Sequence, residues 1–208
     1  MTEREALLAA ICEHPDDDTP RLVFADWLDE NGEPERAEFI RLQCEVARLA
    51  ADDQRAGLID RETELQKKFG KRWIDELPVP DTAHIRWVEA APGGWLDGET
   101  FDRGFACQLF AQTAGVLAKH ADVLFSATPI RRLLIWNIKR GDKLAKMTQL
   151  RHLHTTRIRV FSKQAADDLL ECPYLDSVPD IRFSFTALSE AHIERLRKKF
   201  GDRLQHQP

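Results

Sequence analysis

Residues 16–43 read DDDTPRLVFADWLDENGEPERAEFIRLQ, a stretch dense with helix start and stop signals. Thr19 can cap one helix, because its hydroxyl can accept a backbone N–H of the first turn, and Pro34 suits the first turn of another. Between them, Asn31 and Gly32 supply the left-handed residues that end a helix. The stretch contains no recognisable catalytic motif. It therefore predicts an acidic helical hairpin whose residues specify shape.

The residues on either side of this hairpin also have helical spacing. Thr2 and Glu5 stand in the capping-box arrangement at the start of a first helix, and apolar residues recur every three or four positions after the hairpin. Pro78 and Pro80 then break the chain. The sequence therefore predicts an all-helical domain over residues 1–78. Its helices are expected at residues 2–13, 20–30, 34–51 and 54–70, and the inward side chains of the second are expected to be Leu22, Val23, Phe24 and Trp27.

Residues 20–43 contain the pattern PRLVFADWLxExG followed, after three residues, by RAEFIRxQ. This pattern resembles the repeat-companion domain, a short bacterial module that precedes degenerate leucine-rich repeats in large sets of paralogues. Members of that family look like interaction modules without an enzymatic activity or a ligand, so the resemblance implies an architecture more than a function. The positions of the structural motif are Pro20, Arg21, Phe24, Asp26, Trp27, Leu28, Gly32, Arg36, Glu38, Ile40 and Arg41.

The spacing of apolar residues changes beyond the proline break. Residues 84–88 predict a short strand, residues 105–109 alternate as a half-buried strand does, and residues 111–126 have helical spacing. After residue 128 the form LxxLxL, with an apolar ninth position, occurs three times at intervals of 20 and 25 residues, which is within the range of leucine-rich repeats. The aligned positions are Ile130, Leu133, Ile135, Ile138; Leu150, Leu153, Thr155, Ile158; and Leu175, Val178, Asp180, Phe183.

Each such repeat predicts a short parallel strand that points alternate residues into a shared core, followed by a helix on the outside. The predicted fold class is α/β overall: an N-terminal all-α hairpin or bundle, followed by a short leucine-rich-repeat-like α/β solenoid with parallel strands. The second domain is expected over residues 79–208, with 79–127 as its N-terminal cap and 128–208 as about three degenerate repeats. The outer helices are expected at residues 162–171 and 189–200, each starting at a serine.

Composition limits the classes of protein that this chain can be. With 208 residues, 43% of them hydrophobic, it can form one good core or two small ones. The first twelve residues lack the basic start and apolar run of a signal peptide, and no stretch approaches the ~20 apolar residues of a membrane span. We therefore expect a cytoplasmic protein without a membrane partner.

The net charge of −5 hides an asymmetry between the two ends of the chain. Residues 1–53 carry 15 acidic and 5 basic side chains, whereas residues 128–208 carry 16 basic and 9 acidic ones. The two ends can attract each other within the fold, or each can present a charged face to a different partner.

Acidic side chains gather at residues 16–18 and continue with Asp26, Asp29 and Glu30. Their oxygens could bind Ca²⁺ or Mg²⁺. The spacing lacks the calcium-loop pattern, however, and carboxylates at a helix start also complement the helix dipole. Helix capping and ion pairing therefore explain the cluster better, and no metal or cofactor is predicted. The arginines available to Asp26 and Glu38 are Arg21, Arg36 and Arg41.

His152 and His154 lie two residues apart on a predicted strand and so project to the same face. Such a pair could ligate zinc or copper, but no third ligand can be identified. The alternative is an exposed strand surface around Trp136, whose Arg and His neighbours give it the composition of an interface hot spot. Trp136 could also simply cover the edge of a short solenoid. The candidate partner-binding row is Arg132, Leu134, Trp136, His152, His154 and Thr156.

Nucleophilic catalysis has little support in the sequence. No G-x-S-x-G, P-loop or G-x-G-x-x-G motif occurs. The cysteines form no CxxC pair, which argues against a structural zinc site and against a dense disulfide framework. We expect reduced, mostly buried thiols, with Cys107 and Cys172 as small core residues. The four cysteines are Cys12, Cys44, Cys107 and Cys172.

The leading functional hypothesis is a non-enzymatic protein-interaction or scaffold module that binds a protein partner through the repeat strand face. The alternative is nucleic-acid binding by the basic C-terminal half, against which stand the overall acidity and the lack of a reader motif. A third hypothesis is an enzyme or metal-binding protein that uses the acidic cluster opposite His14 or an arginine. The candidate phosphate contacts are Arg157, Arg159, Lys163, Arg195, Arg197, Lys198 and Lys199.

Overall fold

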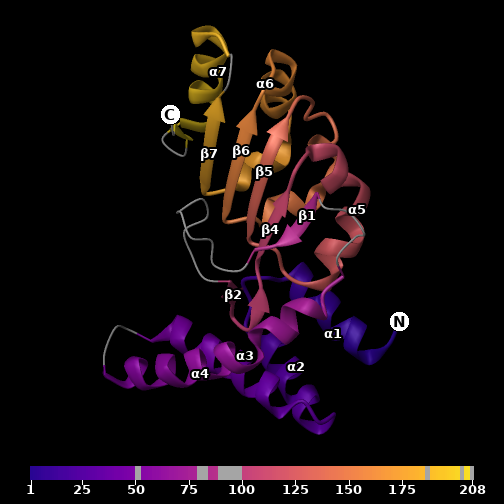
Figure 1. Cartoon of the computed structure of the whole chain (residues 1–208), viewed down its shortest axis with the longest axis vertical. Helices are drawn as coiled ribbons and strands as arrows, with labels where there is room; N and C mark the ends of the chain where they lie inside the picture. The colour runs from indigo at the N-terminus through magenta and orange to yellow at the C-terminus, as the bar shows by residue number, and fades with distance from the viewer. Residues whose placement is uncertain (50–52, 79–83, 89–99, 186–187, 202–203, 207–208) are drawn as a thin grey trace. The chain divides into compact units, whose positions relative to one another are not determined.

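The computed structural model describes residues 1–49, 53–78, 84–88, 100–185, 188–201 and 204–206. Over these residues the protein is a mixed α/β fold with helices in its N-terminal part and a mainly parallel sheet in its C-terminal part (Figure 1). The predicted α/β class is confirmed at this level. The chain divides into two compact units, which we call the helical unit (Met1–Pro78, Phe101–Cys107 and Phe125–Pro129) and the sheet unit (Val79–Thr100, Gln108–Leu124 and Ile130–Pro208).

The helices of the helical unit lie close to where the sequence predicts them, but the fourth continues to Asp75, beyond its predicted end at residue 70. Thr2 forms the predicted capping box, because its hydroxyl accepts the N–H of Glu5 at 3.2 Å and the Glu5 carboxylate accepts the N–H of Thr2 at 2.7 Å. The predicted Thr19 cap is wrong: Thr19 is already helical, and its N–H donates to the Asp17 carboxylate at 2.8 Å. Gly32 follows the second helix with the predicted positive φ, 83°, whereas Asn31 has a φ of −104° and is not left-handed. The helices are α1 (Glu3–Glu13), α2 (Thr19–Glu30), α3 (Pro34–Arg48) and α4 (Asp53–Asp75).

The third helix ends at Arg48, before the predicted end near residue 51, because Leu49 already has an extended backbone. The inward face of α2 also differs from the prediction. Val23 is 49% exposed, whereas Arg21 is completely buried. Arg21 lies on the same helix face as Phe24 and Leu28, and it donates a hydrogen bond to the Asp17 carbonyl at 2.9 Å. The buried core of this unit contains Ile11, Phe24, Ala25, Leu28, Ala37, Ile40, Cys44 and Phe105.

A short hairpin that follows much later in the sequence belongs to the helical unit. It contains only the first part of the strand predicted over residues 105–109, whose second part belongs to the sheet unit, so the prediction of one strand is wrong. Its strands, β2 (Phe101–Asp102) and β3 (Phe105–Ala106), pair antiparallel around a two-residue turn with φ values of 47° and 88°. Positive φ at both turn residues is typical of tight hairpins. The N–H of Gly104 donates to the side chain of Gln43, whose amide donates to Glu62 at 2.7 Å. Gln43 therefore joins α3, α4 and the hairpin.

The sheet unit contains one sheet whose described strands lie in the order β1-β4-β5-β6-β7-β8. β1 pairs antiparallel with β4, and each later neighbouring pair is parallel. The strands are β1 (Ile85–Trp87), β4 (Gln108–Ala111), β5 (Arg132–Ile138), β6 (Thr155–Val160), β7 (Asp180–Phe185) and β8 (Leu204–His206). The helices are α5 (Ala114–Ala127), α6 (Lys163–Leu170) and α7 (Glu190–Phe200), with 3-10 helices η1 (Leu144–Lys146), η2 (Thr148–His152) and η3 (Pro173–Ser177).

The register of this sheet corrects the predicted alignment of the first repeat. Ile135 pairs with Ile158, and Ile158 pairs with Phe183, so equivalent residues are 23 and then 25 positions apart. The predicted interval of 20 residues between the first two repeats is wrong, whereas the interval of 25 is confirmed. Leu150 explains the error: it lies in η2 and is buried there. Leu150 is therefore an apolar residue of a 3-10 helix, although its spacing in the sequence matches that of a strand residue.

Helix ends in the sheet unit largely follow the predicted signals, but α5 begins at Ala114 and not at the predicted residue 111, because Ala111 belongs to strand β4. Ser162 caps α6, because its hydroxyl accepts the N–H of Ala165 at 3.0 Å. Ser189 occupies the position before α7, but its hydroxyl hydrogen-bonds the His192 ring at 2.7 Å. Gly201 ends α7 with a φ of 58°. These signals are predictable because each involves residues only a few positions apart.

Candidate functional site

One face of the sheet carries arginine and aromatic side chains. Along β5 to β7, the buried residues Leu133, Ile135, Thr156, Ile158, Ile181 and Phe183 alternate with residues that point to the opposite face. We call this opposite surface the outer sheet face. It has four arginines and one aspartate, and so it is basic, although Arg157 and Leu134 within it are buried, with exposed fractions of 4% and 8%. Its members are Arg132, Leu134, Trp136, Thr155, Arg157, Arg159, Asp180, Arg182 and Ser184.

Arg159 and Trp136 form the aromatic centre of the outer sheet face. The Arg159 guanidinium lies 4.9 Å from the centroid of the Trp136 ring and 5.0 Å from that of Phe161. Stacking occupies the face of a guanidinium and leaves its N–H donors in the plane for an acceptor. All three side chains are partly exposed. This arrangement suits recognition of an anionic group beside an apolar one.

The structure brings together half of the predicted binding row. Arg132, Leu134 and Trp136 lie on the outer sheet face, as the strand prediction requires. The predicted neighbours of these residues are replaced by others, because the correct register is shifted by three residues. Their neighbours on β6 are therefore Thr155, Arg157 and Arg159.

The other predicted members lie elsewhere. His152 ends the 3-10 helix η2, and His154 precedes β6, where its ring nitrogen contacts the Arg131 guanidinium. Thr156 is fully buried, and its hydroxyl donates to the Leu133 carbonyl at 3.2 Å. The two histidines therefore do not share a strand, and the predicted pair on one strand face is wrong.

The acidic hairpin is paired with arginines of its own unit. Arg41 contacts Asp26 and Asp29, each at 2.7 Å, which confirms one predicted pair. Glu38 pairs at 2.7 Å with Arg61, which holds the pKa of that carboxyl below its usual range by hydrogen bonding. Among the described residues, no three or more His, Cys, Asp or Glu side chains are arranged to hold a metal ion.

Arg36, another residue of the motif, has a role that sequence reasoning missed. Its guanidinium lies 4.5 Å from the Trp73 ring centroid, 5.5 Å from Phe105, 5.6 Å from Phe101 and 5.9 Å from Phe39. Burial lowers its pKa to about 9, and the negative charges of nearby glutamates oppose that shift. Arg36 is therefore an internal cation surrounded by aromatic rings, which corrects its prediction as a partner of a surface carboxylate.

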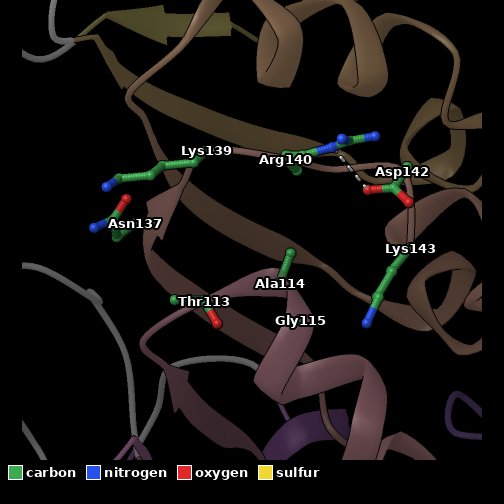
Figure 2. A pocket seen from close by; sticks show the side chains of 8 residues that line it. All are labelled: Thr113, Ala114, Gly115, Asn137, Lys139, Arg140, Asp142 and Lys143. Atoms are coloured by element: carbon green, nitrogen blue, oxygen red, sulfur yellow. Dashed lines mark ion pairs between the residues drawn. The ribbon is translucent and has the colours of Figure 1, made fainter.

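A cleft of about 600 Å³ lies in the sheet unit, where β4 and β5 end and α5 begins (Figure 2). Ala114 faces it from the start of α5, and Lys143 points toward it from the loop that follows β5. Helix N-termini favour anions because of the helix dipole and the first-turn N–H groups, although in α5 the Thr113 hydroxyl already accepts the N–H of Val116 at 3.2 Å. The cleft therefore suits a phosphate or another anion. It is lined by Thr113, Ala114, Gly115, Asn137, Lys139, Arg140, Asp142 and Lys143.

Asp168 on α6 fixes the loop that carries these cations. Its carboxylate accepts the N–H of Gly141 at 2.7 Å and the Gln164 side-chain amide at 2.8 Å, and the residue is only 8% exposed. Arg140 pairs with Asp142 at 3.7 Å within the same loop. This role of Asp168 cannot be predicted from the sequence, because Asp168 and Gly141 are 27 positions apart.

All four cysteines are free, and all except Cys12 are buried, as predicted. Burial raises the pKa of the Cys12 thiol and of the Cys44 thiol to about 12, and it raises the pKa of Cys172 as well. A thiol with a raised pKa has less thiolate at neutral pH, and the thiolate is the nucleophile. The environment of these cysteines therefore disfavours nucleophilic catalysis.

These shifts predict a slow reaction of the native thiols with a disulfide reagent such as Ellman's reagent. At pH 8, Cys12 and Cys44 in the folded protein should react at least ~100-fold more slowly than in 6 M guanidinium, because a rise of about three pKa units reduces the thiolate fraction to that extent or more. Mass spectrometry of the labelled peptides measures each rate. Fast labelling of Cys44 in the native protein would contradict the burial described here.

In the described part of the chain, no helix has the length and apolar character needed to cross a membrane. Comparisons of the chain with protein-family models, with curated proteins and with solved structures found no match.

Proposed function

We propose that this chain is a non-enzymatic protein-interaction module, in which a repeat-companion-like helical unit precedes a short solenoid of degenerate leucine-rich repeats. The solenoid is supported by the parallel strands β5, β6 and β7, whose equivalent residues are 23 and 25 positions apart. Helices follow β6 and β7. The repeat-companion assignment is supported by residues 20–43, which form α2 and most of α3.

The observation that carries the proposal is the composition of the outer sheet face. Trp and Arg are among the residues most enriched in interface hot spots, and here the Arg159 guanidinium lies over the Trp136 ring toward the carboxyl ends of β5 and β6. The excess of arginine favours an acidic partner, because complementary charge speeds association and excludes basic competitors. We infer that the partner is a protein with an acidic segment that lies across β5 and β6.

Affinity capture with matched variants tests this proposal. The wild-type chain, Trp136→Ala and Lys67→Ala would each be immobilised and exposed to extract of the native host, with quantitative mass spectrometry of the retained proteins. Lys67 is an exposed residue of the helical unit and serves as the control. We expect at least one protein with an acidic segment to be retained by the wild type and the control but lost with Trp136→Ala. Equal retention by all three would contradict the proposal.

Nucleic-acid binding is a second candidate, favoured specifically by the cleft at the start of α5. Lys139, Arg140 and Lys143 line that cleft and could contact phosphates. By contrast, part of the predicted C-terminal set is buried or already paired: Arg157 is only 4% exposed, and Arg195 lies 2.6 Å from Asp167. Lys199 likewise donates to the Leu170 carbonyl at 2.6 Å. The cleft is therefore the better candidate for phosphate contact.

A gel-shift titration separates the two candidates. If nucleic acid is the ligand, RNA or single-stranded DNA should bind at ~50 mM salt and be released as salt rises, because phosphate binding releases counterions. Under the protein-interaction proposal, no shift should occur at ~50 mM salt. A shift that Lys139→Glu and Lys143→Glu abolish would favour nucleic acid.

A further inference from the structure

The helical unit contains a small cavity next to Arg36, of about 190 Å³. At ~30 Å³ per molecule, that volume corresponds to about six waters or to one small polar ligand. Its wall includes two arginines, two glutamates and aromatic rings, so it combines charged and apolar surfaces. It is lined by Arg4, Leu8, Phe24, Glu33, Arg36, Trp73, Glu76, Leu77, Pro78, Phe105, Ala106, Ala127 and Thr128.

Two hydrogen-bond donors in the wall lack a protein acceptor in the described part of the chain. They are Nη1 of Arg36 and Nε1 of Trp73, both enclosed by the fold, and Trp73 is only 4% exposed. The ring contacts of Arg36 offer no oxygen or nitrogen acceptor to its N–H groups. Buried donors nearly always have a partner in native proteins. Both donors therefore indicate an acceptor within this cavity.

The acidic residues of the wall are already engaged elsewhere. Glu33 pairs with Arg4, and Glu76 lies 3.7 Å from Arg72. Neither bonds to Nη1 of Arg36. Their negative charges would oppose a doubly charged phosphate more strongly than a singly charged group. A carboxylate has one negative charge and two oxygens, and charge-assisted hydrogen bonds from a guanidinium to a carboxylate are strong.

We propose that this cavity is a binding site for a single carboxylate group, held by Arg36 and by the indole N–H of Trp73. The carboxylate comes either from a small organic acid or from an acidic side chain of a peptide. The site is independent of the outer sheet face, and its residues have no catalytic role: they bind and orient one anionic group.

Indole N–H resonances of the full chain provide a direct test by two-dimensional NMR. The chain has five tryptophans, and the resonance of Trp73 is identified by its loss in Trp73→Phe. Sodium acetate would be titrated at constant ionic strength, with chloride, acetamide and phosphate as comparisons. We expect acetate alone to shift the Trp73 resonance to saturation, with a dissociation constant of roughly 1–50 mM. A separate titration uses N-acetyl-aspartate amide, which carries the side chain of a peptide aspartate. Tighter binding of this compound than of acetate indicates a peptide side chain as the ligand, and tighter binding of acetate indicates a free acid.

Two variants make the test specific. Arg36→Gln should remove the acetate shift, and Glu76→Gln should tighten acetate binding about two- to fivefold by removing a like charge. Glu64→Gln, an exposed glutamate on α4, is the control and should change nothing. If the Arg36→Gln variant does not fold, the acetate affinity of Glu76→Gln is the test: tighter binding supports the proposal, and unchanged binding contradicts it.

Several results would overturn the proposal. One is a Trp73 shift that chloride or acetamide reproduces, and another is the absence of any acetate shift, which would mean that water satisfies both donors. A third is a Trp73 shift in ligand-free Glu76→Gln, which would show that the chain's own Glu76 is the acceptor.

Discussion

Replacement of Gly104 by alanine should lower the free energy of unfolding of the helical unit by about 3–4 kcal/mol. Two costs add: a left-handed backbone costs a residue with a Cβ about 1–2 kcal/mol, and overpacking typically costs about 1–3 kcal/mol. Gly104 has a φ of 88°, and a Cβ there would lie 2.4 Å from Cγ1 of Ile40 and 2.8 Å from its Cα. Because the second clash is with backbone, no rotamer change can relieve it.

Gly32→Ala is the matched control for this prediction. Gly32 has a similar φ, 83°, but a Cβ added there would meet nothing within 4 Å. Gly32→Ala should therefore lower the free energy of unfolding only by the cost of the left-handed backbone, about 1–2 kcal/mol. Native-state hydrogen exchange at the amides of α3 reports the opening free energy of this unit. Equal losses for the two variants would mean that the hairpin does not pack on Ile40.

Charge reversal at Arg159 should weaken partner binding at least about 30-fold, which corresponds to the ~2 kcal/mol of a hot-spot residue. Two contributions are lost together: attraction to the acidic segment, and the stacking that holds the guanidinium 4.9 Å from the Trp136 centroid. Trp136→Ala should have a comparable effect, because it removes both the ring and the support for Arg159. Isothermal titration with the captured partner measures both affinities.

The control for this prediction is Lys163→Glu, which makes the same charge change in the same unit. Lys163 is exposed at the start of α6, outside the outer sheet face. The Lys163→Glu substitution should change the affinity for the partner less than about threefold, which is the effect of a distant charge. If Arg159→Glu also changes the affinity for the partner less than about threefold, the outer sheet face is excluded as the recognition surface.

Helix positions could be predicted from the sequence because their signals are local. The capping box joins Thr2 to Glu5 within one turn, and the positive φ of Gly32 follows from its place between two helical patterns. Strand existence was also predictable in the repeat region, where β6 and β7 occur with the predicted 25-residue spacing. Local residue chemistry determines these features, so no distant contact was needed.

The register of β5 could not be predicted, because several buried leucines outside the strands have the same spacing as strand residues. Leu150 is buried in η2 and gave a false match. A register error of this kind moves each neighbour on the face. Because of this error, the sequence predicts His154 on the strand face and associates Arg159 only with nucleic-acid binding, whereas Arg159 lies beside Trp136 in the structure.

The contacts that build the candidate sites depend on long-range packing. Gln43 receives the N–H of Gly104 across 61 positions, and Arg36 meets rings from α4 and the hairpin. An arginine in a helix with acidic neighbours is typical of a surface ion pair, so its burial among aromatic rings had no local signal. Only the fold places Arg36 and Trp73 around one cavity.

Hydroxyl-radical footprinting of the complex with the captured partner tests the central claim most directly. Trp136 on the outer sheet face and Trp27 on the acidic hairpin are both partly exposed, so each is an internal reference for the other. If the outer sheet face is the recognition surface, oxidation of Trp136 falls on binding while that of Trp27 is unchanged. Protection of Trp27 with unchanged oxidation of Trp136 would contradict the claim and place recognition on the acidic hairpin.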